Sequence, residues 1–381
     1  MCSWEELSEQ AYLLNHASSV ENVYSNSFLD KNVKKACLNR VLFDINVPYD
    51  KRDDKGENAK KRKRIKTTGP FDEITRKVFE NHSSIQHKLP SKAHQSTTNN
   101  KEALEFVDHF NTSSQYDADR RFRGQNSTNH TIITEMDGES FLIPPRVAFI
   151  NSSIDRFEEY IGQDEKFDLI VLDPPWWNKY IRRVKAVNAK ASYRMLTNAD
   201  IKAIPLERHR HENTLVVVWC TNAPSHIDAV VKDFFPKWGV ELVGCWYWVK
   251  ITGSSGQPVC KFNEPAQKQP YERIFIGLPQ GSPIAQNFPR ERFLYSVPCA
   301  IHSHKPPLYD LFTSKFVPPG ATCLELFARS LYPGCTSYGM EVLKLQNKRL
   351  YELAMEEGGA LHLNKYDKTC QLAAPAGQTP P

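Results

Sequence analysis

The sequence lacks several features that would place it in a familiar class of protein. No apolar run approaches the roughly 18 residues that span a membrane. The N-terminus carries Glu5 and Glu6 where a signal peptide needs a basic and then an apolar segment. The nine cysteines form no Cys-x-x-Cys pair, so we expect no metal and no redox dithiol. These absences predict a soluble, non-secreted protein with reduced thiols.

The Gly-x-Gly-x-x-Gly loop that cradles the pyrophosphate of a dinucleotide is also missing. This absence argues against a dinucleotide cofactor. The charge is mildly unbalanced, with a formal net charge of +5 at pH 7. Such a positive excess suits a polyanionic partner without requiring one.

Composition divides the 381-residue chain into four segments. Residues 1–50 space their apolar groups as helices do, which predicts a small helical N-terminal module. Residues 51–130 are mostly polar and predict a basic, partly disordered connector. Short apolar runs over residues 131–363 predict an α/β domain, and residues 364–381 predict a disordered tail.

A dense run of Lys and Arg occupies residues 60–66 of the connector. Such a run is typical of a nuclear-import signal, of an arm that binds phosphates, or of a solvated charged linker. We favour import and therefore expect the protein in the nucleus, with the cytoplasm as a second location.

Within the α/β segment, apolar runs alternate with helix-like pieces, which predicts a largely parallel sheet with helices on both faces. The predicted strands are residues 146–150, 167–172, 214–219, 240–249, 271–278, 321–327 and 337–342. The predicted helices are residues 199–204, 225–235 and 307–316.

One predicted strand, Phe167 to Leu172, ends abruptly in Asp173-Pro174-Pro175-Trp176. Ligands of open α/β sheets gather at the carboxyl ends of strands. The two prolines fix their own φ angles and remove two backbone donors, which predicts a stiff turn with unpaired carbonyls. The alternative is an ordinary turn that ends a strand.

This turn suits an aromatic amine as substrate. The exocyclic amine of adenine is a poor nucleophile because its lone pair is delocalised into the ring. If the Asp173 carboxylate and the Pro174 carbonyl each accept one amine hydrogen, the lone pair can face an incoming methyl group. Trp176 is predicted to stack on the base. The catalytic residues that we predict are Asp173, Pro174, Pro175 and Trp176.

Together with five further motifs, the Asp-Pro-Pro-Trp turn resembles the MT-A70-like adenine methyltransferases over roughly residues 143–342. The other motifs are Val217-Val218-Trp219, Cys245-Trp246-Tyr247-Trp248-Val249-Lys250, Pro270-Tyr271-Glu272, His304-Lys305-Pro306 and Leu324-Glu325-Leu326-Phe327-Ala328-Arg329. The resemblance implies a Rossmann-like domain, S-adenosyl-L-methionine as methyl donor, and the 6-amino group of adenine in a nucleic acid as target.

The resemblance also implies a finer assignment. It favours RNA over DNA, with 2′-O-methyladenosine in a small nuclear RNA as the target, and a chain that is active as a monomer. Adenine in DNA is the first alternative. A non-catalytic scaffold of the same fold that binds nucleic acid, and an enzyme that methylates glutamine or a small molecule, are the others.

The motifs assign roles to individual residues. Lys305 is predicted to bind the methionine carboxylate, and Asp173 the ammonium. Members of the family usually place Asn and Gln at the ribose, whereas this chain reads Tyr338-Gly339-Met340-Glu341, so we expect Glu341 to replace them. The predicted cofactor-binding residues are Asp173, Lys305, Glu325, Phe327, Arg329, Ser152, Ser153 and Glu341. The predicted substrate-binding residues are Trp176, Trp177, Asn178, Lys179, Trp219 and Glu272.

Overall fold

The computed structural model describes residues 3–24, 28–49, 72–90, 100–177, 195–263, 268–318, 320–357 and 360–364. The basic run at 60–66, the predicted substrate residues Asn178 and Lys179, and the tail from residue 365 lie outside the described residues. The division of the chain into domains therefore stays a prediction.

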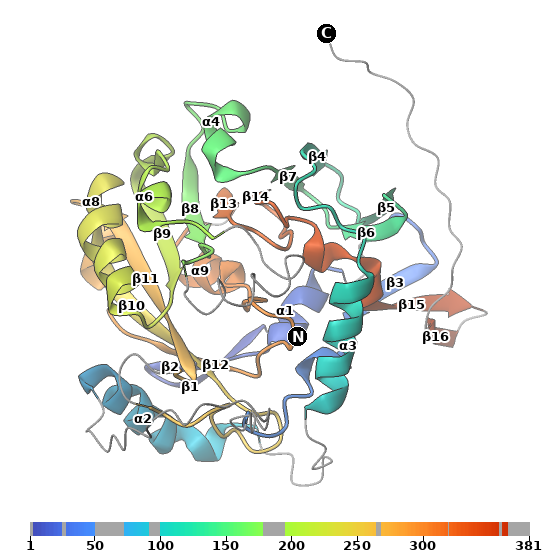
Figure 1. Cartoon of the computed structure of the whole chain (residues 1–381), viewed down its shortest axis with the longest axis horizontal. Helices are drawn as coiled ribbons and strands as arrows, with labels where there is room; N and C mark the ends of the chain where they lie inside the picture. The colour runs from blue at the N-terminus through green and yellow to red at the C-terminus, as the bar shows by residue number, and fades with distance from the viewer. Residues whose placement is uncertain are drawn as a thin grey trace, which may run out of the picture.

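Eleven strands of the described chain form one mixed sheet (Figure 1). In spatial order they are β1 (Trp4–Ser8), β2 (Ala11–Leu14), β12 (Phe293–Ser296), β10 (Val240–Lys250), β11 (Tyr271–Pro279), β9 (Arg210–Cys220), β8 (Phe167–Leu172), β13 (Cys323–Leu326), β14 (Cys335–Tyr338), β7 (Val147–Asn151) and β4 (Phe122–Asn126). Strands β9, β8, β13, β14 and β7 run parallel to one another. The α/β prediction is confirmed, since each of the seven predicted strands overlaps an observed one.

Smaller sheets flank the main one. They comprise β3 (Val33–Leu38) with β15 (Tyr351–Glu357) and β16 (Ala360–Asn364), and the hairpin of β5 (Ile132–Met136) and β6 (Glu139–Ile143). The helices are α1 (His16–Asn22), α2 (Glu73–Ile85), α3 (Lys101–Ser113), α4 (Phe157–Tyr160), α6 (Asn198–Lys202), α7 (Pro224–Asp228), a π-helical stretch (Ala229–Phe234), α8 (Phe235–Lys237) and α9 (Tyr309–Lys315). Among the described residues, no helix has the length and apolarity needed to cross a membrane.

Helices cover both faces of the parallel strands, as predicted. On one face, Ile201 of α6 and Phe234 of the π-helical stretch pack against Ile170 and Val216. On the other face, Leu311 and Phe312 of α9 pack against a separate cluster that contains Leu169 and Trp246. The sheet is therefore buried on both sides, which explains why its strands are nearly continuous apolar runs.

Residues 1–50 do not form the predicted helical module, because strands β1, β2 and β3 lie there beside helix α1. Residues 4–8 and 11–14 form the antiparallel strands β1 and β2, and β2 pairs in parallel with β12. Short apolar runs cannot be assigned to helix or strand by spacing alone, and here the pairing across the sheet decides the outcome. The helix that follows, α1, brings the His16 ring to 4.4 Å from the ring of His304, immediately before Lys305.

Candidate active site

The predicted site residues gather where the parallel strands end. Asp173 follows β8, Phe327 follows β13, Glu341 comes three residues after β14, and Ser152 follows β7. These positions meet because parallel neighbours present their carboxyl ends at one edge of a sheet. Lys305 approaches the same edge from the segment before α9.

Asp173 is the centre of a chain of ion pairs. Its Oδ1 lies 3.5 Å from Lys305 Nζ, and its Oδ2 lies 3.6 Å from Arg329 Nη1. Lys305 Nζ also lies 2.7 Å from Glu272 Oε2, and Arg329 Nε lies 2.9 Å from Glu341 Oε2. All five side chains are only 11 to 22% exposed, so water screens these charges weakly.

The ion pairs compete with burial in setting the protonation of these groups. Burial raises the pKa of Asp173, although Lys305 and Arg329 oppose the shift. Burial would also raise the pKa of Glu272, but Lys250 and Lys305 outweigh it, so that this pKa is lowered. Burial would lower the pKa of Lys305, yet Asp173 and Glu272 raise it. Lys305 therefore remains a cation and Glu272 an anion.

The catalytic turn differs from the prediction of unpaired carbonyls. The Trp176 backbone N–H donates to the Pro174 carbonyl at 2.8 Å, and the Leu196 N–H donates to the Pro175 carbonyl at 3.0 Å. The chain returns to the turn at Leu196, which supplies a donor that the isolated motif could not reveal. The Pro174 carbonyl keeps a second lone pair, so it can still accept one further hydrogen bond.

Trp176 does not lie as predicted. Its indole is only 6% exposed, and its Nε1–H donates to the Trp219 carbonyl at 3.1 Å. The ring belongs to the core cluster beneath the sheet and is stacked on His226. The neighbouring Trp177 is 37% exposed. Trp176 therefore anchors the turn, and its predicted stacking on a base has no support in this geometry.

Trp219, predicted to approach the substrate, lies beneath Lys305 instead. Its side chain is 3% exposed. Lys305 Nζ lies 5.5 Å from the ring centroid of Trp219 and 5.9 Å from that of Trp248, which meets Trp219 edge to face. The two indoles thus form an aromatic support for the lysine cation.

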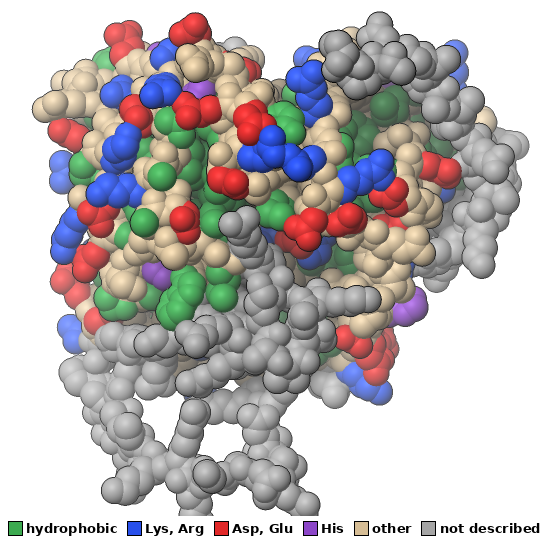
Figure 2. All heavy atoms as spheres, turned by 45° about the horizontal axis from the view of Figure 1, so that its top comes forward, with side chains coloured by type: hydrophobic (Ala, Val, Ile, Leu, Met, Phe, Trp, Pro, Cys, Tyr) green, Lys and Arg blue, Asp and Glu red, His purple; other side chains and the backbone are tan. Residues whose placement is uncertain are grey.

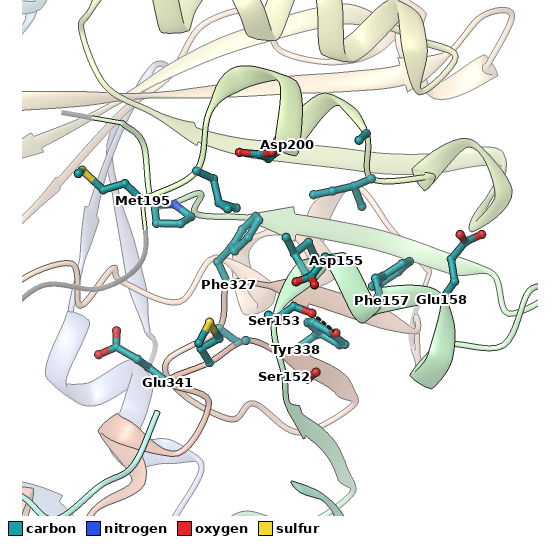
Figure 3. A pocket seen from close by; sticks show the side chains of 18 of the residues that line it. Ser152, Ser153, Asp155, Phe157, Glu158, Met195, Asp200, Phe327, Tyr338 and Glu341 are labelled. Carbon is teal, nitrogen blue, oxygen red and sulfur yellow. Dashed lines mark hydrogen bonds between the residues drawn. The ribbon is translucent and has the colours of Figure 1, made fainter. Parts of the chain in front are cut away.

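A cavity of about 420 Å³ opens beside the turn, at the ends of β7, β13 and β14. Figure 3 shows Phe327 between Asp200 of α6 and Tyr338 of β14, with Glu341 and Glu158 at opposite ends. In Figure 2, which brings the side of α4 and α6 forward, the surface is hollowed between two lobes and carries both acidic and basic side chains. The volume and mixed lining suit a ligand of nucleoside size.

Two backbone features shape this cavity. Phe327 adopts a positive φ of 63°, a conformation that few non-glycine residues take, and its ring lines the cavity. At Gly339 the chains approach so closely that a Cβ would lie 2.7 Å from the Ala328 carbonyl oxygen. The Tyr338 hydroxyl donates to the Ser153 carbonyl at 2.7 Å, which closes the opposite wall. Glycine at 339 is therefore required by packing.

A second, smaller cavity of about 60 Å³ is lined by Asp173, Lys305 and Glu325. Phe327 and Arg329 line both cavities. An elongated ligand can therefore place one end in the larger cavity and a charged end in the smaller one. Ser152 and Ser153 line the larger cavity, and their predicted place on the adenine side of the cofactor stays a prediction.

Sequence reasoning missed several residues at this site. Lys250 bonds Glu272, and Lys344 bonds Glu341 at 2.6 Å. Asp200 lines the larger cavity and also caps α6, in a reciprocal box with Thr197. The Thr-x-x-Asp spacing was a readable signal for that helix start. Lys250 ends one of the motifs that carry the resemblance, but its contact with Glu272 depends on how β10 and β11 pair. Lys344 lies only three residues from Glu341, so that contact is local.

Glu325 gives a pH-dependent prediction. Burial and the nearby Asp173 raise its pKa from 4.5 to about 7. Between these values the folded protein holds a proton that the unfolded chain releases, so this group lowers the free energy of unfolding as pH rises. Compared with wild type, Glu325→Gln should be equally stable below pH 4.5 and more stable at pH 8, by up to about 3 kcal/mol.

Urea unfolding at pH 4.5 and pH 8 measures this difference. Glu341→Gln is the control with opposite sign, because Lys344 and Arg329 outweigh burial and lower the pKa of Glu341. That variant should be less stable than wild type at pH 8. A constant difference between Glu325→Gln and wild type at both pH values would contradict the assignment.

The fold and the position of the cavities indicate the structural class of the protein. A mixed sheet whose central strands run parallel, with helices on both faces and a ligand-sized cavity at its carboxyl edge, is typical of a Rossmann-like α/β fold. Residues 167–341 match the MT-A70 family. Methyltransferases of that family use S-adenosylmethionine.

Similar proteins extend across animals and fungi. A mouse protein named N(6)-adenine-specific methyltransferase METTL4 is 38% identical over 242 residues, which are 61% of this chain and 49% of the mouse protein. A Caenorhabditis elegans protein named DNA N6-methyl methyltransferase is 36% identical over 228 residues, 58% of each chain. N6-methyladenosine RNA methyltransferase MTA1 of Cryphonectria parasitica is 36% identical over 211 residues, 55% of this chain and 61% of the fungal protein. This chain thus spans about half the length of the mouse relative that it matches.

Proposed function

We propose that this protein transfers a methyl group from S-adenosylmethionine to the 6-amino group of adenine in a nucleic acid. The observation that carries the proposal is the position of Asp173, at the end of β8 and between Lys305 and Arg329. The family of residues 167–341 and the names of the similar proteins support it. A scaffold that only binds nucleic acid would not need this buried, charge-paired carboxylate.

The donor set of the two cavities fits the cofactor. Lys305, held over two indoles, offers a cation to the methionine carboxylate. Asp173 and Glu325 offer carboxylates to the methionine ammonium. Glu341 is placed to accept from a ribose hydroxyl in the larger cavity, where Ser152 and Ser153 line the adenine side. The bound cofactor supplies an activated methyl group, so no metal ion is required.

The chain's own contribution is to hold the target amine. Asp173 accepts one amine hydrogen, and the free lone pair of the Pro174 carbonyl accepts the other. The nitrogen lone pair would then face the smaller cavity, whose residues Lys305 and Glu325 would hold the methionine end of the cofactor. Holding the target amine and the methyl donor in this geometry lowers the entropic part of the barrier to methyl transfer.

For the finer assignment we propose RNA, with 2′-O-methyladenosine in a small nuclear RNA as the target. The MTA1 name supports RNA, whereas the worm relative is named for DNA. We further propose that the chain acts as a monomer in the nucleus, on the basis of the family likeness and of the basic run at residues 60–66.

Label transfer from isotopically labelled S-adenosylmethionine tests the function. The substrates are matched single-stranded RNA oligomers with adenosine or 2′-O-methyladenosine, and a DNA equivalent. We expect 6-methylated adenine, most rapidly from 2′-O-methyladenosine RNA. Faster transfer to DNA would overturn the RNA assignment, and cofactor binding without transfer to any oligomer would favour the scaffold.

A further inference from the structure

The catalytic turn is held by His226 of α7, a residue that the sequence did not single out. Its imidazole stacks on the Trp176 indole, with ring centroids 4.7 Å apart and planes 21° from parallel. Phe234 lies parallel to the same indole at 6.2 Å. These contacts leave Trp176 almost no freedom to leave the core, and they link α7 directly to the turn that carries Asp173.

A hydrogen bond orients the imidazole of His226. Its Nδ1 lies 2.7 Å from Thr221 Oγ1, which also accepts the Ala223 backbone N–H at 3.3 Å. When the Thr221 hydroxyl donates its hydrogen to Nδ1, the ring proton of the neutral imidazole lies on Nε2. Burial lowers the pKa of His226, and a hydrogen bond with the Trp177 backbone partly opposes the shift. The neutral ring can thus donate from Nε2 to the Trp177 carbonyl.

Two adjacent tryptophans therefore have opposite surroundings. Trp176 is 6% exposed and held on its face, whereas Trp177 is 37% exposed. Trp177 directly follows the catalytic motif, and a base stacks readily on an exposed indole. An indole on a fixed backbone loses less conformational freedom when it binds than one on a free loop.

We propose that His226 is a positioning residue: it clamps Trp176 and the backbone of Trp177, so that the exposed Trp177 indole forms the stacking surface for the target base. This inference rests on the proposed function and deepens it. It moves base stacking from Trp176 to Trp177 and assigns Trp176 to the support of the turn.

Three substitutions separate the contacts of His226. His226→Ala removes stacking and hydrogen bonds, His226→Phe keeps stacking alone, and His226→Gln keeps hydrogen bonding alone. The control is His109→Ala, which changes an exposed histidine on α3. For each protein we would measure kcat and KM with the best RNA oligomer, the Kd for S-adenosylmethionine, and the midpoint of thermal unfolding.

We expect His226→Ala to lower kcat/KM about 10- to 100-fold, mainly through KM, without weakening cofactor binding. The kcat/KM values of His226→Phe and His226→Gln should lie between those of His226→Ala and wild type. Trp177→Ala should raise KM similarly, and the double variant His226→Ala/Trp177→Ala should raise it no further, because the two residues act as one unit. His109→Ala should match wild type.

Several results would overturn the inference. They are an unchanged kcat/KM in His226→Ala, equal losses of cofactor and RNA binding, or additive effects in the double variant. If His226→Ala does not fold, the same measurements of kcat, KM and cofactor Kd are made on His226→Phe. A wild-type protein that methylates no oligomer would refute the proposed function itself, whereas an active wild type with active His226 variants would refute only this inference.

Discussion

Asp173→Ala is expected to lower the turnover of methyl transfer by about 100- to 1,000-fold, since it removes a positioned acceptor for the target amine. Cofactor affinity should change by less than about tenfold, because Lys305 remains to bind the methionine carboxylate and Glu325 the ammonium. The turnover of Asp173→Asn should lie between those of wild type and Asp173→Ala, since the amide keeps an oxygen acceptor but loses the charge. Single-turnover label transfer and equilibrium cofactor binding measure the two quantities.

Asp168→Ala is the matched control for this substitution. Asp168 lies on the same strand, near its opposite end, where its carboxylate bonds His211 and the Thr322 backbone. Its loss should reduce stability but leave turnover per folded molecule unchanged. If Asp173→Ala retained wild-type turnover, or if both substitutions reduced turnover equally, Asp173 would not be the residue that holds the amine.

The position of Asp173 could be predicted because the information is local. A buried six-residue strand followed by two prolines defines a strand end, and the structure places β8 and the turn there. The same holds for β9, β10 and β11, whose long apolar runs leave few alternatives. By contrast, β1 and β2 are strands only because the edge of β12 is available for pairing, which spacing within residues 1–14 cannot show.

The environment of the site residues could not be predicted, because it depends on distant segments. The register that pairs Trp248 with Glu272 brings Lys250 beside Glu272. Trp176 is buried because α7 places His226 against it. A local motif thus identifies the reacting group, whereas charge pairing and exposure follow from tertiary structure.

Lys305→Ala is expected to weaken cofactor binding by about 10- to 100-fold, the effect of losing one charge-assisted hydrogen bond. It should also destabilise the fold, because Asp173 and Glu272 lose the cation that lies 3.5 and 2.7 Å away. Removing one partner of a fully buried pair costs about 3–5 kcal/mol. These side chains keep 14 to 22% exposure and other cations remain, so we expect about 1–3 kcal/mol.

Lys315→Ala provides a control of the same chemistry at a remote place. Lys315 of α9 lies over Trp4 and Tyr12, at 4.7 and 4.9 Å from their ring centroids, as Lys305 lies over Trp219 and Trp248. Its loss should leave the Kd for S-adenosylmethionine unchanged. Lys305→Arg should recover stability more fully than affinity, because its charge still pairs with both carboxylates while its planar group differs in geometry. Unchanged cofactor affinity in Lys305→Ala would place the methionine carboxylate elsewhere and would leave Lys305 as a counter-ion that keeps Asp173 ionised.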